Sequence, residues 1–325
     1  MFRPPALVQP KNASAYTPPG KETDMQTPLH FILQFDMKSP YNKAYRSAAE
    51  ALSCSLSAGE AAGKTPCTTI VLCDTDEAIQ RHQMAGLPVI AVSHDGNSSE
   101  ELMGTPWLIL SPEALTRDFL YKVYCRHYKR PMWILETERC WLRELSAEDC
   151  DALLFLQEEN AQNPEGCFFP AGCDNPEDFL MNYIRHQYPF FDFGLYAVLE
   201  KETGNFMGIA GFTGITEIAS DGRHMAMTVQ DTSDGSSSAA IQATSNYSPS
   251  AAANTTSDGI SLSTEVSYAL LQKYQHRGFA KEVLFALLAH GRKTGEFRQF
   301  TARIRPENTS SVALARKCSI RIYHI

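Results

Sequence analysis

The sequence predicts two consecutive domains, an α/β unit with a parallel sheet and then an α+β domain. Between residues 28 and 130, short apolar segments alternate with helical patterns, as they do in proteins with parallel sheets. From about residue 135 the pattern changes to a β-hairpin and strand–helix pairs. A chain of 325 residues has room for both domains, and its 43% of hydrophobic residues supports ordinary globular cores.

The composition disfavours nucleic-acid and membrane partners. The chain carries 29 basic and 37 acidic residues, a net charge of −8, which argues against wholesale binding of nucleic acid. No apolar run is long enough to cross a bilayer, and the N-terminus has no secretory signal. The nine cysteines form no regular metal-binding or disulfide framework, so we expect reduced thiols, no metal site and a cytoplasmic location. The oligomeric state is not predicted.

The elements of the first domain follow from its apolar runs and capping residues. Residues 1–27 are rich in Pro, Lys, Thr and Gln and are expected to form a disordered tail. Asp74 stands between an apolar run and a helical pattern, where an N-cap is expected rather than a metal ligand. We expect strands at residues 30–37, 68–73, 87–92 and 107–110, and helices at 41–56, from 74 to about 86, and from 111 onward.

The segment 71–92 resembles the last acidic motif of the haloacid dehalogenase-like hydrolases. In that family an Asp after the strand, and often a second Asp four residues later, help to hold magnesium. Asp74 matches the first position, but Ala78 stands at the second, and the first strand offers Asp36-Met-Lys instead of a D-x-D-x-T nucleophile motif. The resemblance therefore implies a degenerate unit, kept for structure, docking or regulation, without the residues needed for phosphoryl transfer.

The second domain begins with a strand at residues 140–143. Ser146 and Asp149 form a capping-box-like turn that opens its first helix. Pro176 takes the first position of a second helix, where proline is favoured. A hairpin then joins a strand from Leu195 to a strand ending near Phe212.

Three segments of this domain depart from a compact pattern. The loop 160–175, which contains Phe168-Phe169-Pro170, either overlies the substrate end of the cleft or packs on the sheet as a hydrophobic plug. Residues 219–261 are dominated by Ser, Ala, Thr, Asp, Gly and Asn, so we expect a disordered insertion. After Cys318 the closing strands are missing or very short.

The stretch 265–284 has the most chemical content. A short strand precedes the turn Gln275-His-Arg-Gly-Phe-Ala280, of the form Q-x-x-G-x-A, and a helix follows. The small residues in the turn let the backbone come close to a ligand, and the first amides of the helix have no intrahelical partner. Arg277 and Lys281 add positive charge. A pyrophosphate group is the ligand that we expect such a helix N-terminus to bind.

This strand–turn–helix resembles the acetyl-CoA-binding core of the GNAT acyltransferase superfamily. The pattern P-E-N-x-x-S at residues 306–311, after a strand near residue 300, extends the resemblance. The similarity covers residues 135–325 and is greatest to the branch related to ribosomal-protein N-terminal acetyltransferases. It implies a mixed, mainly antiparallel sheet whose fourth and fifth strands splay apart. It also implies acetyl transfer from acetyl-CoA, as co-substrate, to a primary amine of a protein N-terminus or small molecule. The alternative is a catalytically weak or inactive GNAT-fold module for binding or regulation.

The resemblance also assigns site residues. Glu265 is the candidate general base, with a solvated strand-end carboxylate as the alternative, and Ser311 is a second candidate catalytic residue. No Tyr stands at Leu314-Ala315-Arg316, so the general acid would be Ser311, Tyr323 or water. Asn308 is also a candidate helix N-cap. The predicted cofactor-binding residues are Tyr268, Leu270, Leu271, Gln275, His276, Arg277, Gly278, Phe279, Ala280, Asn308 and Ser311.

Overall fold

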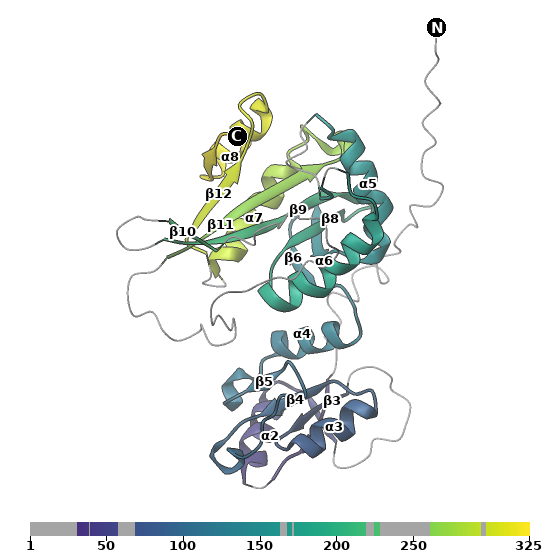
Figure 1. Ribbon diagram of the computed structural model, residues 1–325, viewed down its shortest axis with the longest axis vertical. Helices are drawn as coiled ribbons and strands as arrows, with labels where there is room; N and C mark the ends of the chain where they lie inside the picture. Colours follow the sequence, from purple (N-terminus) through teal and green to yellow (C-terminus); the bar gives the residue numbers. More distant parts are fainter. Residues whose placement is uncertain are drawn as a thin grey trace. The chain divides into compact units, whose positions relative to one another are not determined.

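Two units, divided between Met132 and Trp133, make up the part of the chain that this computed structural model describes (Figure 1). The predicted tail, residues 1–27, lies outside the described residues. Among the described residues, no helix has both the length and the apolar character needed to cross a membrane. The described residues are 31–38, 40–57, 69–162, 168–170, 172–218, 224–227, 261–293 and 297–325.

The N-terminal unit is built on a parallel five-stranded sheet of order β2-β1-β3-β4-β5, as predicted for an α/β unit (Figure 1). The sheet has buried side chains on both faces: Ile70 and Leu72 of one strand belong to one apolar cluster, and the alternating Val71 and Cys73 to another. This explains the continuous apolar run at that strand. The strands are β1 (Ile32–Asp36), β2 (Ser55–Ser57), β3 (Thr69–Cys73), β4 (Val89–Val92) and β5 (Leu108–Ile109). The helices are α2 (Tyr41–Ala51), α3 (Asp76–Met84) and α4 (Arg117–His127), with short 3-10 turns at Asp95–Asn97 and Pro112–Ala114.

Two predictions for this unit were wrong in detail. The helix predicted over residues 41–56 ends at Ala51, because Ser53 takes a left-handed conformation (φ 57°) and the chain then forms β2. Asp74 is not the N-cap of α3. Thr75 is, since its Oγ1 accepts a hydrogen bond from the amide of Ala78 at 3.3 Å.

The C-terminal unit is built on an eight-stranded sheet of order β13-β12-β11-β9-β8-β7-β6, with β10 paired to β9. Only the β11–β12 and β12–β13 pairs are parallel, so the predicted mixed, mainly antiparallel sheet is confirmed. The strands are β6 (Trp133–Glu136), β7 (Cys140–Glu144), β8 (Leu195–Glu200), β9 (Phe206–Ile218), β10 (His224–Met227), β11 (Ser261–Leu270), β12 (Gln299–Arg303) and β13 (Arg321–Tyr323). The helices are α5 (Cys150–Glu159), α6 (Pro176–Phe191), α7 (Phe279–Lys293) and α8 (Thr309–Lys317), with 3-10 turns at Ala147–Asp149 and Gln272–Tyr274.

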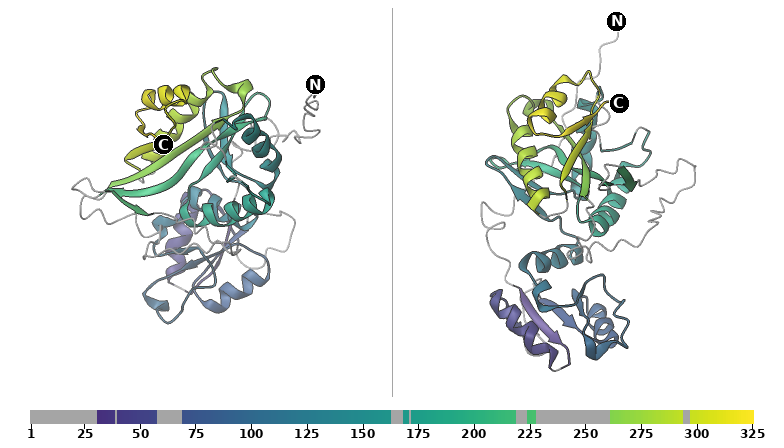
Figure 2. Two further views of the ribbon diagram at one scale, coloured as in Figure 1. Left: turned by 45° about the horizontal axis from the view of Figure 1, so that its top comes forward. Right: turned by 90° about the vertical axis from the view of Figure 1, so that its left-hand side faces the viewer.

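The edges of this sheet differ from the sequence-based expectations. The strand expected to open the domain, β7, is preceded by β6, which pairs with it antiparallel. β10 lies within the segment 219–261 that was predicted to be a disordered insertion, so that prediction was wrong for this strand; β11 also begins at its last residue, Ser261. The other residues of that segment lie outside the described part of the chain. At the opposite edge, the short closing strand is β13, next to α8 in yellow (Figure 2).

The loop before α6 forms a hydrophobic plug. Phe168 and Phe169 are both buried, and their rings contact Phe179, with centroids 5.7 and 6.0 Å apart. The ring of Phe168 also lies 5.0 Å from that of Tyr183 on α6. Of the two interpretations of this loop, the structure therefore favours packing against the core over a role at the substrate end of the cleft.

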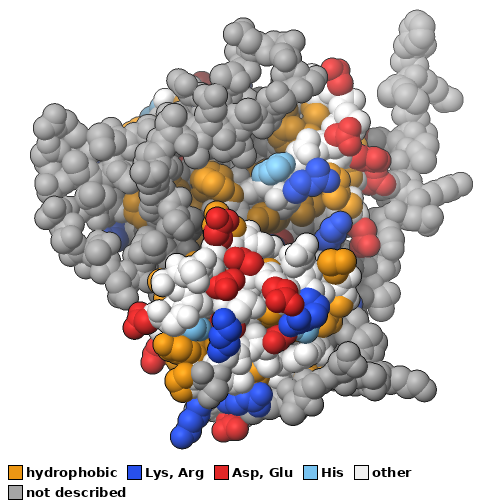
Figure 3. All heavy atoms as spheres, turned by 60° about the horizontal axis from the view of Figure 1, so that its bottom comes forward, with side chains coloured by type: hydrophobic (Ala, Val, Ile, Leu, Met, Phe, Trp, Pro, Cys, Tyr) orange, Lys and Arg blue, Asp and Glu red, His pale blue; other side chains and the backbone are white. Residues whose placement is uncertain are grey.

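Acidic and basic side chains are interspersed on the face drawn in Figure 3. Neither sign of charge gathers into a continuous surface on that face.

A buried ion pair anchors the start of α5. Arg143 and Asp149 are 2% and 5% exposed, and two hydrogen bonds of 2.7 and 2.8 Å join their side chains. Asp149 also accepts the amide of Ser146 at 2.8 Å, which completes the predicted capping box. Asp149 therefore ties β7 to the turn that opens α5.

We expect Asp149→Ala to lower the free energy of unfolding of the C-terminal unit by about 3–5 kcal/mol, because it leaves the Arg143 guanidinium buried without its carboxylate. Urea denaturation followed by tryptophan fluorescence measures this change. The control is Asp151→Ala, which removes an exposed carboxylate from the first turn of the same helix. An equal cost for both variants would contradict the prediction.

Candidate active site

A wedge opens in the sheet where β11 and β12 part. The two strands pair only from Ser263 opposite Gln299 to Glu265 opposite Thr301. Beyond this point β11 continues to Leu270 but pairs with β9 alone. The backbone edge of β11 that faces β12 is therefore left without a strand partner from residue 266 to residue 270. The predicted splay of the fourth and fifth strands corresponds to this separation.

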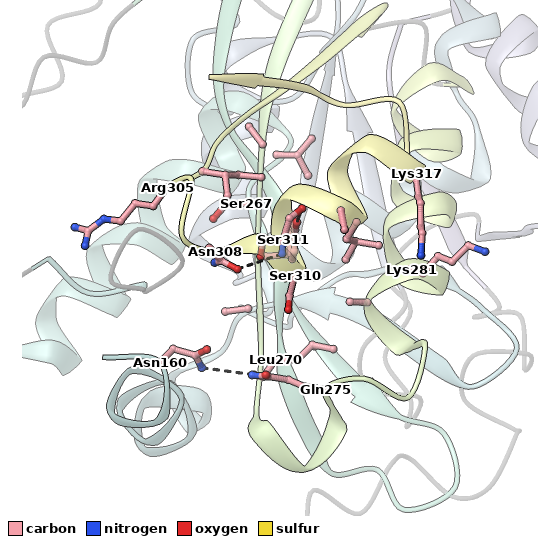
Figure 4. Close-up of a pocket in the computed structure, with 18 of the residues that line it drawn as sticks. Asn160, Ser267, Leu270, Gln275, Lys281, Arg305, Asn308, Ser310, Ser311 and Lys317 are labelled. Atoms are coloured by element: carbon pink, nitrogen blue, oxygen red, sulfur yellow. Dashed lines mark hydrogen bonds between the residues drawn. The ribbon is translucent and has the colours of Figure 1, made fainter. Parts of the chain in front are cut away.

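A cavity of about 610 Å³ occupies the wedge (Figure 4). Its walls come from β11, the start of α7, the end of β12 and α8, with Asn160 contributed from the end of α5. Asn160 Nδ2 lies 3.5 Å from the Leu270 carbonyl oxygen, at the end of β11. The cavity is therefore assembled from residues more than 100 positions apart in the sequence, all within the C-terminal unit.

Most of the predicted site residues line this cavity. They are Glu265, Tyr268, Leu270, Gln275, His276, Gly278, Ala280, Asn308 and Ser311. The side chains of Leu271, Arg277 and Phe279 do not belong to its described walls. Leu271 and Phe279 are buried in the core, at 5% and 3% exposure, and the Arg277 guanidinium lies 5.1 Å from the Phe279 ring. For Leu271 and Phe279 a direct contact with a ligand would therefore come from the backbone, whereas the Arg277 side chain is exposed on the same turn.

The turn before α7 has the backbone of an anion site. His276 and Gly278 both take positive φ, at 57° and 86°, and such alternation turns successive amides toward one side. The first bond of the helical ladder runs from the Glu282 amide to the Gly278 carbonyl oxygen at 3.1 Å. Within the described part of the chain, the amides of residues 276–281 have no acceptor, as expected for a helix N-terminus.

Gln275 differs from this group. Its amide donates to the Gln272 carbonyl oxygen at 3.1 Å, so it is already used by the preceding 3-10 turn. Its side-chain Nε2 donates to the Leu270 carbonyl oxygen at 2.7 Å. Gln275 therefore holds the turn against the end of β11, and the available amides begin one residue later than predicted.

Glu265 stands at the vertex of the wedge, as the last residue of β11 that pairs with β12. Its side chain is 26% exposed, and Arg303 Nε donates to Glu265 Oε1 at 2.8 Å. This hydrogen bond and the charge of the carboxylate raise the pKa of Arg303. Glu265 is therefore held at the cavity wall by Arg303, and its role as a general base stays a prediction.

The N-terminus of α8 faces the cavity from the other side. Asn308 Oδ1 accepts the Ser311 amide at 3.1 Å, so the predicted N-cap role of Asn308 is confirmed. The Tyr268 hydroxyl donates to the Ser311 carbonyl oxygen at 3.1 Å, and burial raises the pKa of Tyr268 to about 12. Tyr268 is therefore a proton donor throughout the neutral range, and it borders the cavity. Tyr323, one of the predicted candidate acids, lies on β13 and is not among the described residues that line the cavity.

Several lining residues escaped the sequence analysis. Those with polar side chains are Asn160, Ser267, Tyr274, Arg303, Arg305, Ser310 and Lys317. The helical period would have found Lys317, since Ser310, Leu314 and Lys317 recur at spacings of four and three on the face of α8 that lines the cavity. No local pattern marks Asn160 or Arg303, which reach the site only through the tertiary fold.

The sequence pattern of the acetyltransferase (GNAT) domain family matches residues 139–321. This range is more than half of the chain and contains the whole cavity apart from Ile325. The chain therefore belongs to the GNAT acetyltransferase family. The predicted enzyme class, an acyltransferase that uses acetyl-CoA for N-acetylation, is confirmed by this membership.

Known structures of the same class are similar to this chain at low identity. The ribosomal L7/L12 α-N-protein acetyltransferase RimL is 17% identical, with 58% of this chain and 80% of that chain covered at a TM-score of 0.38. A putative GNAT-family acetyltransferase from Bordetella pertussis is 19% identical, with 57% and 87% covered at 0.35. The microcin C7 self-immunity acetyltransferase MccE, solved with acetyl-CoA and AMP, is 13% identical, with 56% and 78% covered at 0.35. A comparison with curated proteins found no match.

Proposed function

We propose that the C-terminal unit transfers the acetyl group of acetyl-CoA to a primary amine, of a protein N-terminus or a small molecule. The observation that carries this proposal is the wedge between β11 and β12, with unpartnered amides at the turn before α7 and a carboxylate at its vertex. A ligand with a diphosphate and a long amide-containing arm has matching partners along this path. The free amides take the diphosphate, and the open edge of β11 takes the arm.

The catalytic steps follow from the groups at the vertex. The amine must lose a proton as its nitrogen attacks the thioester carbonyl carbon, and Glu265 accepts that proton, directly or through a water. The carbon–sulfur bond then breaks, and the thiolate leaving group takes a proton. Tyr268 supplies it by turning its hydroxyl from the Ser311 carbonyl oxygen to the sulfur, and the tyrosinate then regains a proton from water. Ser311 borders the same space and is the second candidate for a contact with the thioester.

We expect Tyr268→Phe to lower kcat about tenfold to a hundredfold, which is at or below the lower end of general acid catalysis, because a thiolate is itself a fair leaving group. The affinity for acetyl-CoA should change little. Steady-state assays of thiol release measure kcat, with Tyr323→Phe as the matched control because that hydroxyl lies outside the described cavity walls. A larger loss of kcat in Tyr323→Phe than in Tyr268→Phe would indicate that Tyr323, on β13, protonates the leaving thiolate.

The molecule that accepts the acetyl group is proposed only as a primary amine, without a choice between a protein N-terminus and a small molecule. One structurally similar protein is a ribosomal L7/L12 α-N-protein acetyltransferase, and another is a microcin C7 self-immunity acetyltransferase. We propose a protein N-terminus as the first class to test, in agreement with the sequence resemblance, and a cytoplasmic location. The buried thiols of Cys140, Cys150 and Cys318, whose pKa values burial raises, suit a reducing compartment.

Calorimetry with acetyl-CoA, followed by thiol-release assays on peptides with free N-termini and on small amines, tests the function. Binding in the micromolar range and turnover on at least one amine are expected. Absence of binding would overturn the proposal. Binding without turnover would instead favour the alternative of an inactive GNAT-fold binding or regulatory module. The engagement of Glu265 by Arg303 and the absence of a Tyr at residues 314–316 are the observations that favour it.

We also propose that the N-terminal unit is a degenerate haloacid dehalogenase-like unit, spanning about residues 28–130. Asp36 and Asp74 end neighbouring parallel strands, β1 and β3, where such hydrolases place their acidic residues. Both carboxylates are already engaged. Asp36 lies 2.6 Å from Arg81 and 2.8 Å from His82, and buried Asp74 accepts the Lys38 amide at 2.7 Å.

A magnesium site does not fit these residues well, since Arg81 and His82 contact Asp36 Oδ2 and the Lys38 amide contacts Asp74 Oδ2, so cationic and backbone donors already hold one oxygen of each carboxylate. A role in structure, docking or regulation agrees with this arrangement. Magnesium-dependent hydrolysis of phosphate esters by the full chain, lost on Asp36→Asn, would contradict the proposal of a degenerate unit.

A further inference from the structure

Two lysines border the end of the cavity that adjoins the start of α7. Lys281 lies in the first turn of α7 and Lys317 is the last residue of α8, and both line the cavity. Figure 4 draws both side chains at the same end of the cavity. The charge of Lys281 acts on the thiol of Cys318, the residue after Lys317, and partly offsets the rise in pKa that burial causes there. Lys281 therefore lies within electrostatic reach of the end of α8.

Neither ammonium group is neutralised by a carboxylate in the part of the chain that the structure describes. Among the described residues, no Asp or Glu forms an ion pair with Lys281 or Lys317. The one carboxylate in the first turn of α7, Glu282, is bound instead to Arg139 at 2.7 Å. Two like charges at one end of a cavity repel each other, and an anion bound between them attracts both and so offsets that repulsion.

The position of the pair relative to the rest of the site indicates which anion it takes. α8 begins at Asn308 and Ser311, beside Tyr268 and the proposed acyl end, and finishes at Lys317. Its nine residues span about 13 Å at the helical rise of about 1.5 Å per residue. Lys317 is therefore remote from the thioester. Lys281 instead carries the last of the free amides proposed to hold the diphosphate.

We propose that Lys281 and Lys317 bind the 3′-phosphate of the CoA ribose and make the protein discriminate CoA from 3′-dephospho-CoA. This inference rests on the proposed function. In CoA the 3′-phosphate and the diphosphate are attached to the same ribose, so a diphosphate on the turn before α7 brings a second dianionic group beside these lysines. The amides of the turn then donate hydrogen bonds to the diphosphate, and the two lysines bind the 3′-phosphate through their charge.

Binding of CoA and of 3′-dephospho-CoA, measured by calorimetry on the full chain, tests the proposal without any catalytic readout. For the unmodified protein we expect CoA to bind about tenfold more tightly. In the double variant Lys281→Ala/Lys317→Ala we expect this preference to fall to about twofold or less. The loss should come from weaker binding of CoA, with the affinity for 3′-dephospho-CoA unchanged. Each single variant should lose part of the preference.

Lys293→Ala is the matched control, because it removes the same charge from the other end of α7. It should keep the tenfold preference. Equal binding of the two ligands by the unmodified protein would overturn the 3′-phosphate site and leave the proposed function standing. A preference that persists in the double variant would overturn it as well. Failure of the unmodified protein to bind either ligand would overturn the proposed function, and this inference with it.

Discussion

Replacing Gly278 by valine should weaken the binding of acetyl-CoA by at least about 100-fold. Gly278 has a φ of 86°, a conformation that costs a β-branched residue about 1–2 kcal/mol or more. Relaxation of that strain moves the neighbouring amides, and each hydrogen bond lost to a charged group costs about 1.5–3 kcal/mol. Since about 1.4 kcal/mol is a factor of ten, losing two such bonds suffices for the expected effect.

The space around Gly278 makes this a test of the ligand site. A Cβ atom at that position would meet only the Arg139 side chain, at 3.5 Å, so the fold has room for the substitution. The matched control is Gly86→Val in the N-terminal unit, where φ is also positive, at 74°, and a Cβ atom would have no neighbour within 4 Å. Calorimetry on both variants should show loss of binding only for Gly278→Val. Retention of micromolar binding there would place the diphosphate elsewhere.

Replacing Glu265 by glutamine should reduce kcat by about 10²–10³-fold while leaving the affinity for acetyl-CoA nearly unchanged. Removal of a general base typically costs about 10²–10⁴-fold. Glutamine keeps the shape of the side chain and can still accept a hydrogen bond from Arg303, so the vertex of the wedge should remain intact. The measurement is kcat from steady-state assays of thiol release at neutral pH, with the affinity for acetyl-CoA measured by calorimetry.

The control for this variant is Glu307→Gln. It makes the same change of charge in the loop between β12 and α8, on an exposed side chain that is not among the described cavity-lining residues. That variant should keep full activity. If Glu265→Gln retained wild-type turnover, the carboxylate would be structural, a partner for Arg303 and not a base.

Much of the fold was predictable because its signals are local. A buried parallel strand such as β3 has apolar residues on both faces and is recognisable as a continuous run. The start of α6 carries a local signal in Pro176, its first residue, and the 3-10 turn that leads into α5 carries the capping box at Ser146. Prediction failed where the end of a helix depended on the backbone conformation of a single residue. Ser53 ends α2 and allows β2 to form, and nothing in its neighbourhood distinguishes it from a residue inside the helix.

The candidate site likewise has a part that is encoded locally and a part that depends on distant residues. The turn from Gln275 to Ala280 could be found in the sequence because amides, glycine and helix start are contiguous. The partners of that turn could not. Arg303 meets Glu265 across 38 positions, and Asn160 reaches Leu270 across 110.

The order of residues was enough to reveal an anion-binding turn, a second motif in the right place after it and two regions with different strand–helix patterns. Each of these is encoded within about twenty consecutive residues. The opening between β11 and β12, the ion pair that holds Glu265 and the two lysines at one end of the cavity became visible only in three dimensions. They depend on where strand pairing stops and on which side chains from separate elements then face one another, and these are properties of packing that no single segment carries.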